Sequence, residues 1–351
     1  MGQSKKVTIY DVASLAGVSK GTVDRVIYSR GRVSVSTADR VREAIRDTGY
    51  SANLYASVLA SRKQYVLACL LPKFAPRQYW DEIYKGFIQG IESVKSFNFV
   101  PEVKLYDQYD EHAFINACRE VLELKPGGVI FHPFFASASA SFSSQLYEKG
   151  IPYGYVDGKI DDRHYLVYYG VSLYKSGYLG AHLLTDRLDV KDVLIVRIKR
   201  DVDDKSDPTY NRRRGFIDYI NQHFPDCRIH ILFVNPNDRA EINSAMENFF
   251  DVHPEVKNVI MLNSRVHLIA DFIRTHPSKG RIVVGFDDIE DNINALRDGY
   301  VDLLVTRHIQ QQSFNVVTNL ADYIVQGVKP EKKDNYMHID VLTKYNLDDY
   351  L

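Results

Sequence analysis

The 351-residue sequence has few cysteines and no long apolar run. Its three cysteines, Cys69, Cys118 and Cys227, lie far apart and are odd in number. This favours reduced, buried thiols over a disulfide framework or a zinc site. No apolar stretch approaches the roughly 18–20 residues that a membrane-spanning helix needs, and the N-terminus lacks the apolar core of a secretory signal. We therefore expect a cytoplasmic protein with no membrane partner.

The net charge of −1 conceals an uneven distribution. Residues 1–63 carry eleven Lys/Arg and five Asp/Glu, whereas residues 64–351 carry 33 and 40, so a basic N-terminal segment precedes an acidic body. Such a distribution indicates that only the small segment meets a polyanion. The length suits two or three compact units.

Two short helices joined by a glycine-containing turn are predicted near the N-terminus. Thr8, with Asp11 three residues later, is a capping box that predicts the start of the first helix. The turn at Gly17 leads to a second helix that Ser19 can cap and that runs to about Tyr28. Two helices joined in this way form a helix-turn-helix, in which the N-terminal half of the second helix enters the major groove.

A third helix is predicted to open at Ser36, because Asp39 three residues later completes another capping box. On the second helix, Arg25 can address a guanine edge or a phosphate. The three helices would share a core of the following apolar positions: Ile9, Val12, Ala13, Ala16, Val23, Val26, Ile27, Val41, Ala44 and Ile45.

The order of these residues resembles the DNA-binding headpiece of the LacI/GalR family. The resemblance covers residues 7–13 (VTIYDVA), 16–19 (AGVS) and 22–26 (TVDRV), and continues to Gly49-Tyr50. It implies a sequence-specific DNA-binding protein that acts on double-stranded operator DNA.

The resemblance also implies which residues read bases. The first two residues of the second helix, Lys20 and Gly21, would do so with Arg25, and because Gly21 has no side chain the task would fall mainly on the other two. Asp24 stands where the family usually has serine; phosphates would repel its carboxylate, although it can accept from a cytosine amino group. The predicted DNA-binding set is Thr8, Tyr10, Ser19, Lys20, Gly21, Thr22, Asp24, Arg25, Tyr28, Asn53, Ala56 and Leu59.

Residues 51–63 are predicted to be a hinge. In the family this segment folds into a short helix on operator DNA, and Leu59 aligns with the leucine that enters the minor groove and kinks the duplex. Asn53 can cap the helix and Ala56 permits close approach of a second copy; a plain flexible linker is the alternative. An isolated helix this short is marginal in water, so its order would depend on DNA and on the dimer.

From Tyr65 onward, apolar runs alternate with helical patterns. This alternation predicts parallel sheets of the doubly wound type, and about nine strands over about 280 residues fit two lobes better than one sheet. The predicted strands are Val66–Leu71, Val100–Tyr106, Gly128–Phe131, Pro152–Val156, Val193–Arg197, Ile229–Val234, Asn258–Leu262, Arg281–Phe286 and Leu303–Thr306. Predicted helices between them include Trp80–Phe97, His112–Leu124, Tyr174–Asp186 and Asn211–His223.

The body resembles the two-lobed, type I periplasmic sugar-binding-protein fold that LacI/GalR proteins carry. The best local motifs are NRRRGF at 211–216 and VVGFDD at 283–288. The expected organisation is an all-α helix-turn-helix domain at 1–50, the hinge at 51–63, and an α/β effector-binding and dimerisation domain at 64–351. Its first lobe would span about 64–168 plus 306–334, and its second about 169–305 plus 335–351.

Ligands in this fold bind at the carboxyl ends of strands, where the two lobes face each other. The resemblance implies that Arg212 and Asp287 contact the effector, and a guanidinium and a carboxylate suit polyhydroxyl ligands because each can bind two hydroxyls. The alternatives are a solvated charge for Arg212 and a helix-capping acid for Asp287. The predicted effector set, which adds residues near the ends of other strands, is Tyr79, Trp80, His132, Asp157, Arg212, Asn263, Asp287 and Gln310.

We therefore expect a transcriptional repressor of carbohydrate-utilisation genes, controlled by a sugar or sugar derivative and acting as a homodimer or tetramer. Both directions of effector response are compatible with the sequence. No cofactor, metal or catalytic residue is expected, since a phosphate loop, a Gly-x-Ser-x-Gly elbow and a His-Glu-x-x-His motif are all missing from it. Two alternatives are a periplasmic-type solute-binding protein, against which the headpiece and the missing signal argue, and a sugar-acting enzyme.

Overall fold

The computed structural model describes residues 7–27, 31–50, 63–186, 190–199, 209–277 and 280–350. The chain divides into two compact units, Met1–Lys63 and Gln64–Leu351, which are described separately below. Within the described part of the chain, no helix is both long and apolar enough to cross a membrane.

Three helices form the N-terminal unit: α1 (Ile9–Ala16), α2 (Lys20–Ile27) and α3 (Val35–Thr48). Each contributes a fully buried valine to the common core, Val12, Val23 and Val41 respectively. The ten predicted apolar positions all belong to this core, as buried residues or as partly buried residues packed against it. The spacing of apolar residues in the sequence was therefore enough to predict the core of this unit.

Local side-chain chemistry sets the limits of α1 and α2, as predicted. The backbone N–H of Thr8 donates to Asp11 Oδ2 at 2.7 Å, and the N–H of Thr22 donates to Ser19 Oγ at 3.2 Å. Gly17 ends α1 with φ 62°, a left-handed conformation that glycine adopts without strain.

The predicted start of the third helix was wrong by two residues. Ser34, not Ser36, caps α3, because its extended backbone aims Oγ at the N–H of Thr37, 3.3 Å away. Asp39 closes no capping box; its carboxylate instead accepts from Arg42 Nη1 at 2.9 Å, one turn further along the helix.

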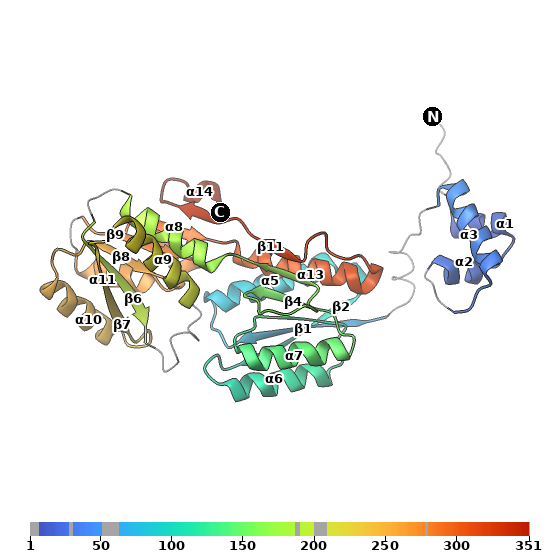
Figure 1. Ribbon diagram of the computed structural model, residues 1–351, viewed down its shortest axis with the longest axis horizontal. Helices are drawn as coiled ribbons and strands as arrows, with labels where there is room; N and C mark the ends of the chain where they lie inside the picture. The colour runs from blue at the N-terminus through green and yellow to red at the C-terminus, as the bar shows by residue number, and fades with distance from the viewer. Residues whose placement is uncertain are drawn as a thin grey trace. The chain divides into compact units, whose positions relative to one another are not determined.

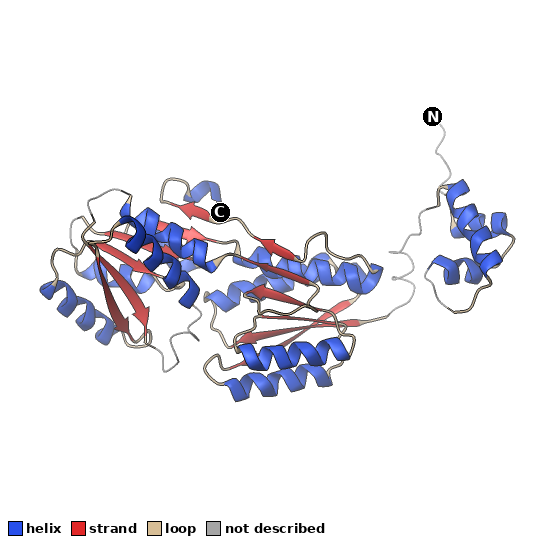
Figure 2. Ribbon diagram, in the orientation of Figure 1, coloured by secondary structure: helices blue, strands red, loops and turns tan. Residues whose placement is uncertain are grey.

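Two six-stranded sheets, one in each lobe, form the C-terminal unit (Figures 1 and 2). The first runs β11-β5-β4-β3-β1-β2 and the second β12-β10-β9-β8-β6-β7. All neighbours pair in parallel except β12, which is antiparallel to β10. The strands are β1 (Tyr65–Pro72), β2 (Phe99–Tyr106), β3 (Gly128–Phe131), β4 (Tyr153–Asp157), β5 (Val167–Gly170), β6 (Asp192–Ile198), β7 (Arg228–Val234), β8 (Asn258–Met261), β9 (Ile282–Phe286), β10 (Leu303–Thr306), β11 (Asp334–Tyr336) and β12 (Asp340–Leu342).

All nine predicted strands are present, and the prediction of parallel, doubly wound sheets is confirmed. The sequence interpretation missed β5, β11 and β12, which have only three or four residues each. β11 and β12 have three residues each and little apolar content. β5 is as long as the predicted β3, β8 and β10, but it has only one aliphatic residue, Val167, and so stands out less from a loop.

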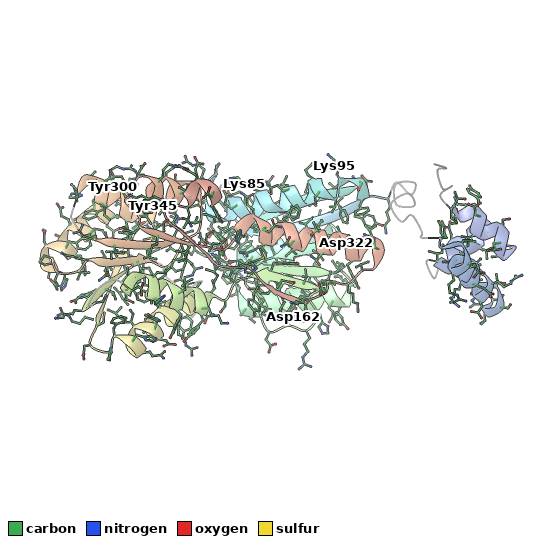
Figure 3. The ribbon with its side chains drawn as sticks, turned by 90° about the horizontal axis from the view of Figure 1, so that it is seen from above. Lys85, Lys95, Asp162, Tyr300, Asp322 and Tyr345 are labelled. Atoms are coloured by element: carbon green, nitrogen blue, oxygen red, sulfur yellow. The ribbon has the colours of Figure 1, made fainter. Side chains whose placement is uncertain are left out.

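Helices cover both faces of each sheet. In the first lobe, α5 and α13 lie on one face and α6 and α7 on the other; in the second, α8 and α9 lie opposite α10, α11 and α12 (Figure 1). Figure 3 shows Lys85 of α5 and Asp322 of α13 on the paired helices of the first lobe. The helices are α5 (Tyr79–Ser93), α6 (Glu111–Glu123), α7 (Ala136–Glu148), α8 (Leu173–Thr185), α9 (Tyr210–His223), α10 (Arg239–Val252), α11 (His267–Thr275), α12 (Glu290–Arg297), α13 (Ile309–Gln326) and α14 (Leu347–Tyr350), with a 3₁₀ turn at Lys95–Phe97.

The chain crosses between the lobes at three places: from β5 to α8, from β10 to α13, and from β11 to β12. The expected lobe limits, near residues 168, 305 and 334, fall close to these crossings. Because the carboxyl ends of parallel strands in both sheets lead toward the crossings, polar residues at those ends can meet between the lobes.

Candidate functional site

A cavity of about 680 Å³ lies between the two lobes. Residues at the carboxyl ends of strands of both sheets line it, among them Asp157, the last residue of β4, and Asp287, which directly follows β9. The volume is within the range of small-molecule pockets. Its position is the one expected for a ligand site in this type of fold.

Seven of the eight predicted effector residues line the cavity: Tyr79, Trp80, His132, Asp157, Arg212, Asn263 and Asp287. Gln310 requires a correction, because it lies in the first turn of α13 on the side that faces α5. There its Nε2 donates to Glu82 Oε2 at 2.6 Å, and its Oε1 accepts from Gln89 Nε2 at 3.1 Å.

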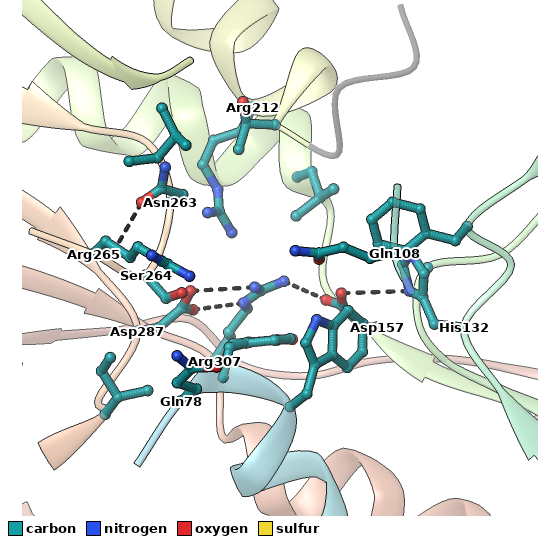
Figure 4. Close-up of a pocket in the computed structure, with 18 of the residues that line it drawn as sticks. Gln78, Gln108, His132, Asp157, Arg212, Asn263, Ser264, Arg265, Asp287 and Arg307 are labelled. Carbon is teal, nitrogen blue, oxygen red and sulfur yellow. Dashed lines mark hydrogen bonds and ion pairs between the residues drawn. The ribbon is translucent and has the colours of Figure 1, made fainter. Parts of the chain in front are cut away.

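The sequence interpretation missed Arg307, which takes the central place in the cavity (Figure 4). Its Nε donates to Asp287 Oδ1 at 2.7 Å, and its Nη1 donates to Asp157. Asp157 belongs to the first lobe and Asp287 to the second, so one guanidinium joins the two lobes. The signal in the sequence is that Arg307 directly follows β10; Gln310, the residue predicted from the same segment, lies three positions further on.

Burial and ion pairing compete in this cluster. Arg307, Asp157 and Asp287 are 7, 8 and 1% exposed. Burial by itself would raise the pKa of Asp157, but Arg307, together with His132, Tyr79 and Arg212, more than offsets it and holds that pKa below its ordinary value. In the same way burial opposes the charged form of Arg307, yet the two carboxylates raise its pKa well above the ordinary value. Arg307 and Asp157 are therefore charged in the folded protein.

The backbone at the two carboxylates adopts a conformation that side chains disfavour. Asp157 and Asp287 have φ of 66° and 70°, in the left-handed region, at a cost of about 1–3 kcal/mol each. The amide of Asn292 stabilises one of these turns, because its Nδ2 donates to the carbonyl oxygens of both Phe286 and Asp287 at 3.0 Å. Such strain is typical of a functional site, and here it directs both carboxylates toward Arg307.

Arg212 enters the cavity from the first turn of α9. Its Nε donates to Ser176 Oγ at 3.0 Å and its Nη1 to the carbonyl oxygen of Leu262 at 2.7 Å, while its guanidinium lies 4.2 Å from the ring centroid of Phe286. Burial, and then the positive charge of Arg307, lower the pKa of Arg212 to about 10. The side chain is 3% exposed, and the predicted alternative of a solvated charge is therefore wrong.

Two glycines make this position of Arg212 possible. A Cβ on Gly177 of α8 would lie 1.8 Å from the carbonyl oxygen of Arg212, and one on Gly215 would lie 2.0 Å from that of Tyr174. The backbones of α8 and α9 are thus in direct contact, which no larger residue would allow.

Aromatic rings form one wall of the cavity. Trp80 lies edge-on to His132, with ring centroids 5.3 Å apart, and both lie near Phe134. His132 Nδ1 is 3.2 Å from the carbonyl oxygen of Val156 and 3.5 Å from Asp157 Oδ2, and burial lowers the pKa of this histidine. A wall of this kind suits the apolar face of a ring-shaped ligand.

A second contact joins the lobes at the rim of the cavity. Arg77, which follows β1, pairs with Glu290 and Asp291 of α12 at 2.8 Å each. All three side chains are at least 44% exposed, so this pair is solvated, unlike the pair formed by Arg307.

The predicted DNA-binding residues in the described headpiece lie on α1, on α2 and in the turn between them. Lys20, Gly21 and Arg25 are exposed, and Lys20 Nζ lies 5.4 Å from the ring centroid of Tyr10. Thr8 and Ser19 are engaged in the cap hydrogen bonds described above, and Thr22 and Asp24 are half-buried. The remaining predicted residues lie outside the described residues; they are Tyr28, Asn53, Ala56 and Leu59.

Two family matches cover most of the chain. Residues 68–328 match the periplasmic binding protein domain, and residues 8–53 match the bacterial regulatory proteins of the lacI family. The structure also resembles a crystal structure described as a LacI transcriptional regulator from Bacteroides fragilis, with a TM-score of 0.77 and 32% sequence identity over 82% of this chain and 100% of that one. The chain belongs to the LacI family.

Other similarities of this LacI-family chain are more limited. The HTH-type transcriptional regulator MalR of Streptococcus pneumoniae is 35% identical over 126 residues, which are 36% of this chain and only 38% of MalR. GanP, a glucose-galactose binding protein from Geobacillus stearothermophilus, has a TM-score of 0.66 at 18% identity over 82% of this chain and 99% of GanP, which shows the fold alone.

The described residues of this family member include no cluster of three or more His, Cys, Asp or Glu side chains that could hold a metal ion. The cavity offers ion pairing and hydrogen bonding by Arg212, Arg307, Asp157 and Asp287, beside an aromatic wall. These groups suit recognition of a polar small molecule.

Proposed function

We propose that this LacI-family protein is a transcriptional repressor that binds double-stranded operator DNA through α2. Its affinity for that DNA depends on a small molecule in the cavity. One observation carries the proposal: a chain with an exposed basic helix-turn-helix also holds a cavity whose charged groups come from two lobes. The name of the S. pneumoniae relative, a transcriptional regulator, supports the same reading.

The regulation is a shift between two arrangements of the lobes. A ligand that binds one arrangement better moves the equilibrium by its differential affinity, and couplings of about 1–3 kcal/mol are typical. Arg307 lies in the β10–α13 crossover and pairs with both lobes, so a ligand that changes this pairing can change how the lobes sit.

The effector in this proposal is a sugar or sugar derivative, bound without a cofactor. The aromatic wall beside Trp80 and the guanidinium and carboxylate groups match the faces and hydroxyls of a carbohydrate. The protein would act in the cytoplasm, where its DNA is, as a homodimer whose two headpieces read a near-palindromic site.

The test is operator binding measured by fluorescence anisotropy at low ionic strength, with DNA from the protein's own promoter region. We expect binding that a carbohydrate changes in the wild type. Asp287→Ala should retain operator binding and lose the carbohydrate response. A protein that ignores this DNA both with and without every sugar tried would refute the proposal, and sugar binding alone would favour a solute-binding protein.

A further inference from the structure

Most of the oxygens of the two buried carboxylates in the cavity already have a partner inside the protein. Asp287 already accepts from Arg307 with both oxygens, at 2.7 and 3.3 Å, and Asp157 accepts with Oδ1 from the same guanidinium. Three of the four oxygens of Asp157 and Asp287 are thus occupied by an internal cation. A ligand must match what remains.

Arg212 supplies the most prominent unused donor. Although the residue is 97% buried, its Nη2 has no hydrogen-bond acceptor among the described residues. Figure 4 shows the guanidinium pointing into the cavity, toward the row formed by Asp287, Arg307 and Asp157. A buried donor left unpaired is destabilising, and more so when the group is charged, so a ligand that supplies an acceptor here is favoured.

Asn263, on the same side of the cavity, offers a second donor. Its Oδ1 accepts from the backbone N–H of Arg265 at 2.9 Å, which fixes the amide orientation and leaves Nδ2 with no partner among the described residues. Arg212 and Asn263 come from the same lobe and both line the cavity. Together they present N–H groups to one end of a ligand.

The cavity lining is also less acidic than the rest of the body. Residues 64–351 carry seven more acidic than basic residues, whereas the cavity lining has six Lys/Arg and four Asp/Glu. Two of these cations, Arg77 and Lys159, pair with Glu290 and Asp334 outside the lining, so the cavity is close to neutral and does not repel an anion as the acidic body would. The lining residues counted here are Lys73, Arg77, Lys159, Arg212, Arg265 and Arg307, with Glu111, Asp157, Asp287 and Asp291.

We infer that the effector is an acidic polyhydroxyl compound, with an oxyanion that Arg212 and Asn263 bind. That the ligand acts as an effector rests on the proposed function, whereas its binding to the cavity needs no DNA. The guanidinium fork matches a carboxylate or a phosphate geometrically, and the anion would also relieve the repulsion between Arg212 and Arg307. The aromatic wall beside Trp80 receives the carbon skeleton.

The chain carries a built-in probe for the test, because Trp80 is its only tryptophan and lines the cavity. Trp80 fluorescence is titrated with matched sets: D-glucose, D-glucuronate and D-glucose 6-phosphate; D-galactose, D-galacturonate and D-galactose 6-phosphate; and D-mannose, D-mannuronate and D-mannose 6-phosphate. We expect at least one acid to bind at least about 10-fold more tightly than its neutral parent, the lower end of what a charge-assisted hydrogen bond contributes. The carboxylate and phosphate arms tell the two anions apart.

Variants assign the preference to Arg212. Arg212→Gln should weaken binding of the acid by about 10- to 100-fold while changing affinity for the neutral parent much less, and Arg212→Lys should restore part of the loss. Arg214→Gln is the matched control, since Arg214 lies on the same helix, is 62% exposed and pairs with Asp218 outside the cavity. Far-ultraviolet circular dichroism confirms that each variant is folded.

Three results would overturn the inference: a neutral sugar that binds better than its acids, no acid that binds at all, or an acid preference that Arg212→Gln leaves intact. The proposed function has a separate readout. If operator binding responds only to a neutral sugar, the proposed function stands and the acidic effector is refuted. If an acid binds but the protein has no affinity for its promoter DNA, the acidic ligand stands and the proposed function is refuted.

Discussion

The two units of this LacI-family protein differ in where they place their charged side chains. The headpiece keeps Lys20 and Arg25 exposed and buries only apolar residues in its core. The C-terminal unit buries Arg212, Arg307 and two carboxylates in the cavity between its lobes. A partner that arrives from solvent needs the first arrangement, whereas a small ligand enclosed by protein needs the second.

The two arrangements differ in how much stability is lost when one charged residue is replaced. An exposed charge contributes little to folding and is free to serve binding. A buried charge is stable only with its partner, so the removal of one member leaves the others uncompensated. Substitutions of charged residues should therefore lower stability more in the C-terminal unit than in the headpiece.

Arg307→Leu should lower the free energy of unfolding of the C-terminal unit by about 3–5 kcal/mol, because Asp157 and Asp287 would remain buried without a counter-charge. Urea unfolding followed by Trp80 fluorescence measures this. The matched control is Arg77→Leu, which also breaks a pair between the lobes but an exposed one, and should cost about 1 kcal/mol or less. Equal losses in the two variants would contradict a buried ionic link.

Arg25→Ala should weaken specific operator binding by about 1–3 kcal/mol, as expected for the loss of a base or phosphate contact. Its exposed side chain is not part of the core, so the stability of the headpiece should change little. Anisotropy with promoter DNA gives the affinity, and effector titration of Trp80 fluorescence should match the wild type. Loss of both activities would indicate misfolding and refute the assignment of Arg25.

Gly177→Ala should destabilise the C-terminal unit by about 1–3 kcal/mol, because the new Cβ would force α8 away from the carbonyl oxygen of Arg212. Gly21→Ala in the headpiece should do the opposite. A Cβ on Gly21 meets nothing closer than 3.8 Å, and alanine is the better helix former by about 1 kcal/mol. Thermal unfolding by circular dichroism compares them, and a neutral effect at Gly177 would mean that α8 and α9 can separate freely.

Acid should weaken the C-terminal unit before the headpiece, and this is the smallest expected effect. Burial lowers the pKa of His132 and of His267, so the unfolded chain binds protons that the folded chain excludes. The free energy of unfolding should therefore fall as the pH decreases below about 6.5, the ordinary histidine value. Residues 1–63 contain no histidine.

Urea unfolding at pH 7.5, 6.5 and 5.5 checks the pH effect through Trp80 fluorescence. The double variant His132→Gln/His267→Gln should flatten the dependence, and His338→Gln, a change at an exposed residue, should not. A flat wild-type profile across this range would show that the two histidines are not held neutral.

Local sequence patterns were enough to predict the headpiece, nine of the twelve described strands, and seven of the eight residues expected in the cavity. Each of these follows from local rules: apolar spacing, a cap three residues before its partner, or a polar residue at the end of a strand. Even the error at Ser34 amounts to a choice between two serines two residues apart.

Which charged residues pair depends on the tertiary fold. Arg307 and Asp157 are 150 residues apart in the chain, and nothing local distinguishes this pairing from others. Likewise, Gln310 faces α5 rather than the cavity because helix packing turns it there. Spacing along a chain fixes which face a residue lies on, but contact between distant segments depends on how the two sheets and their helices pack together.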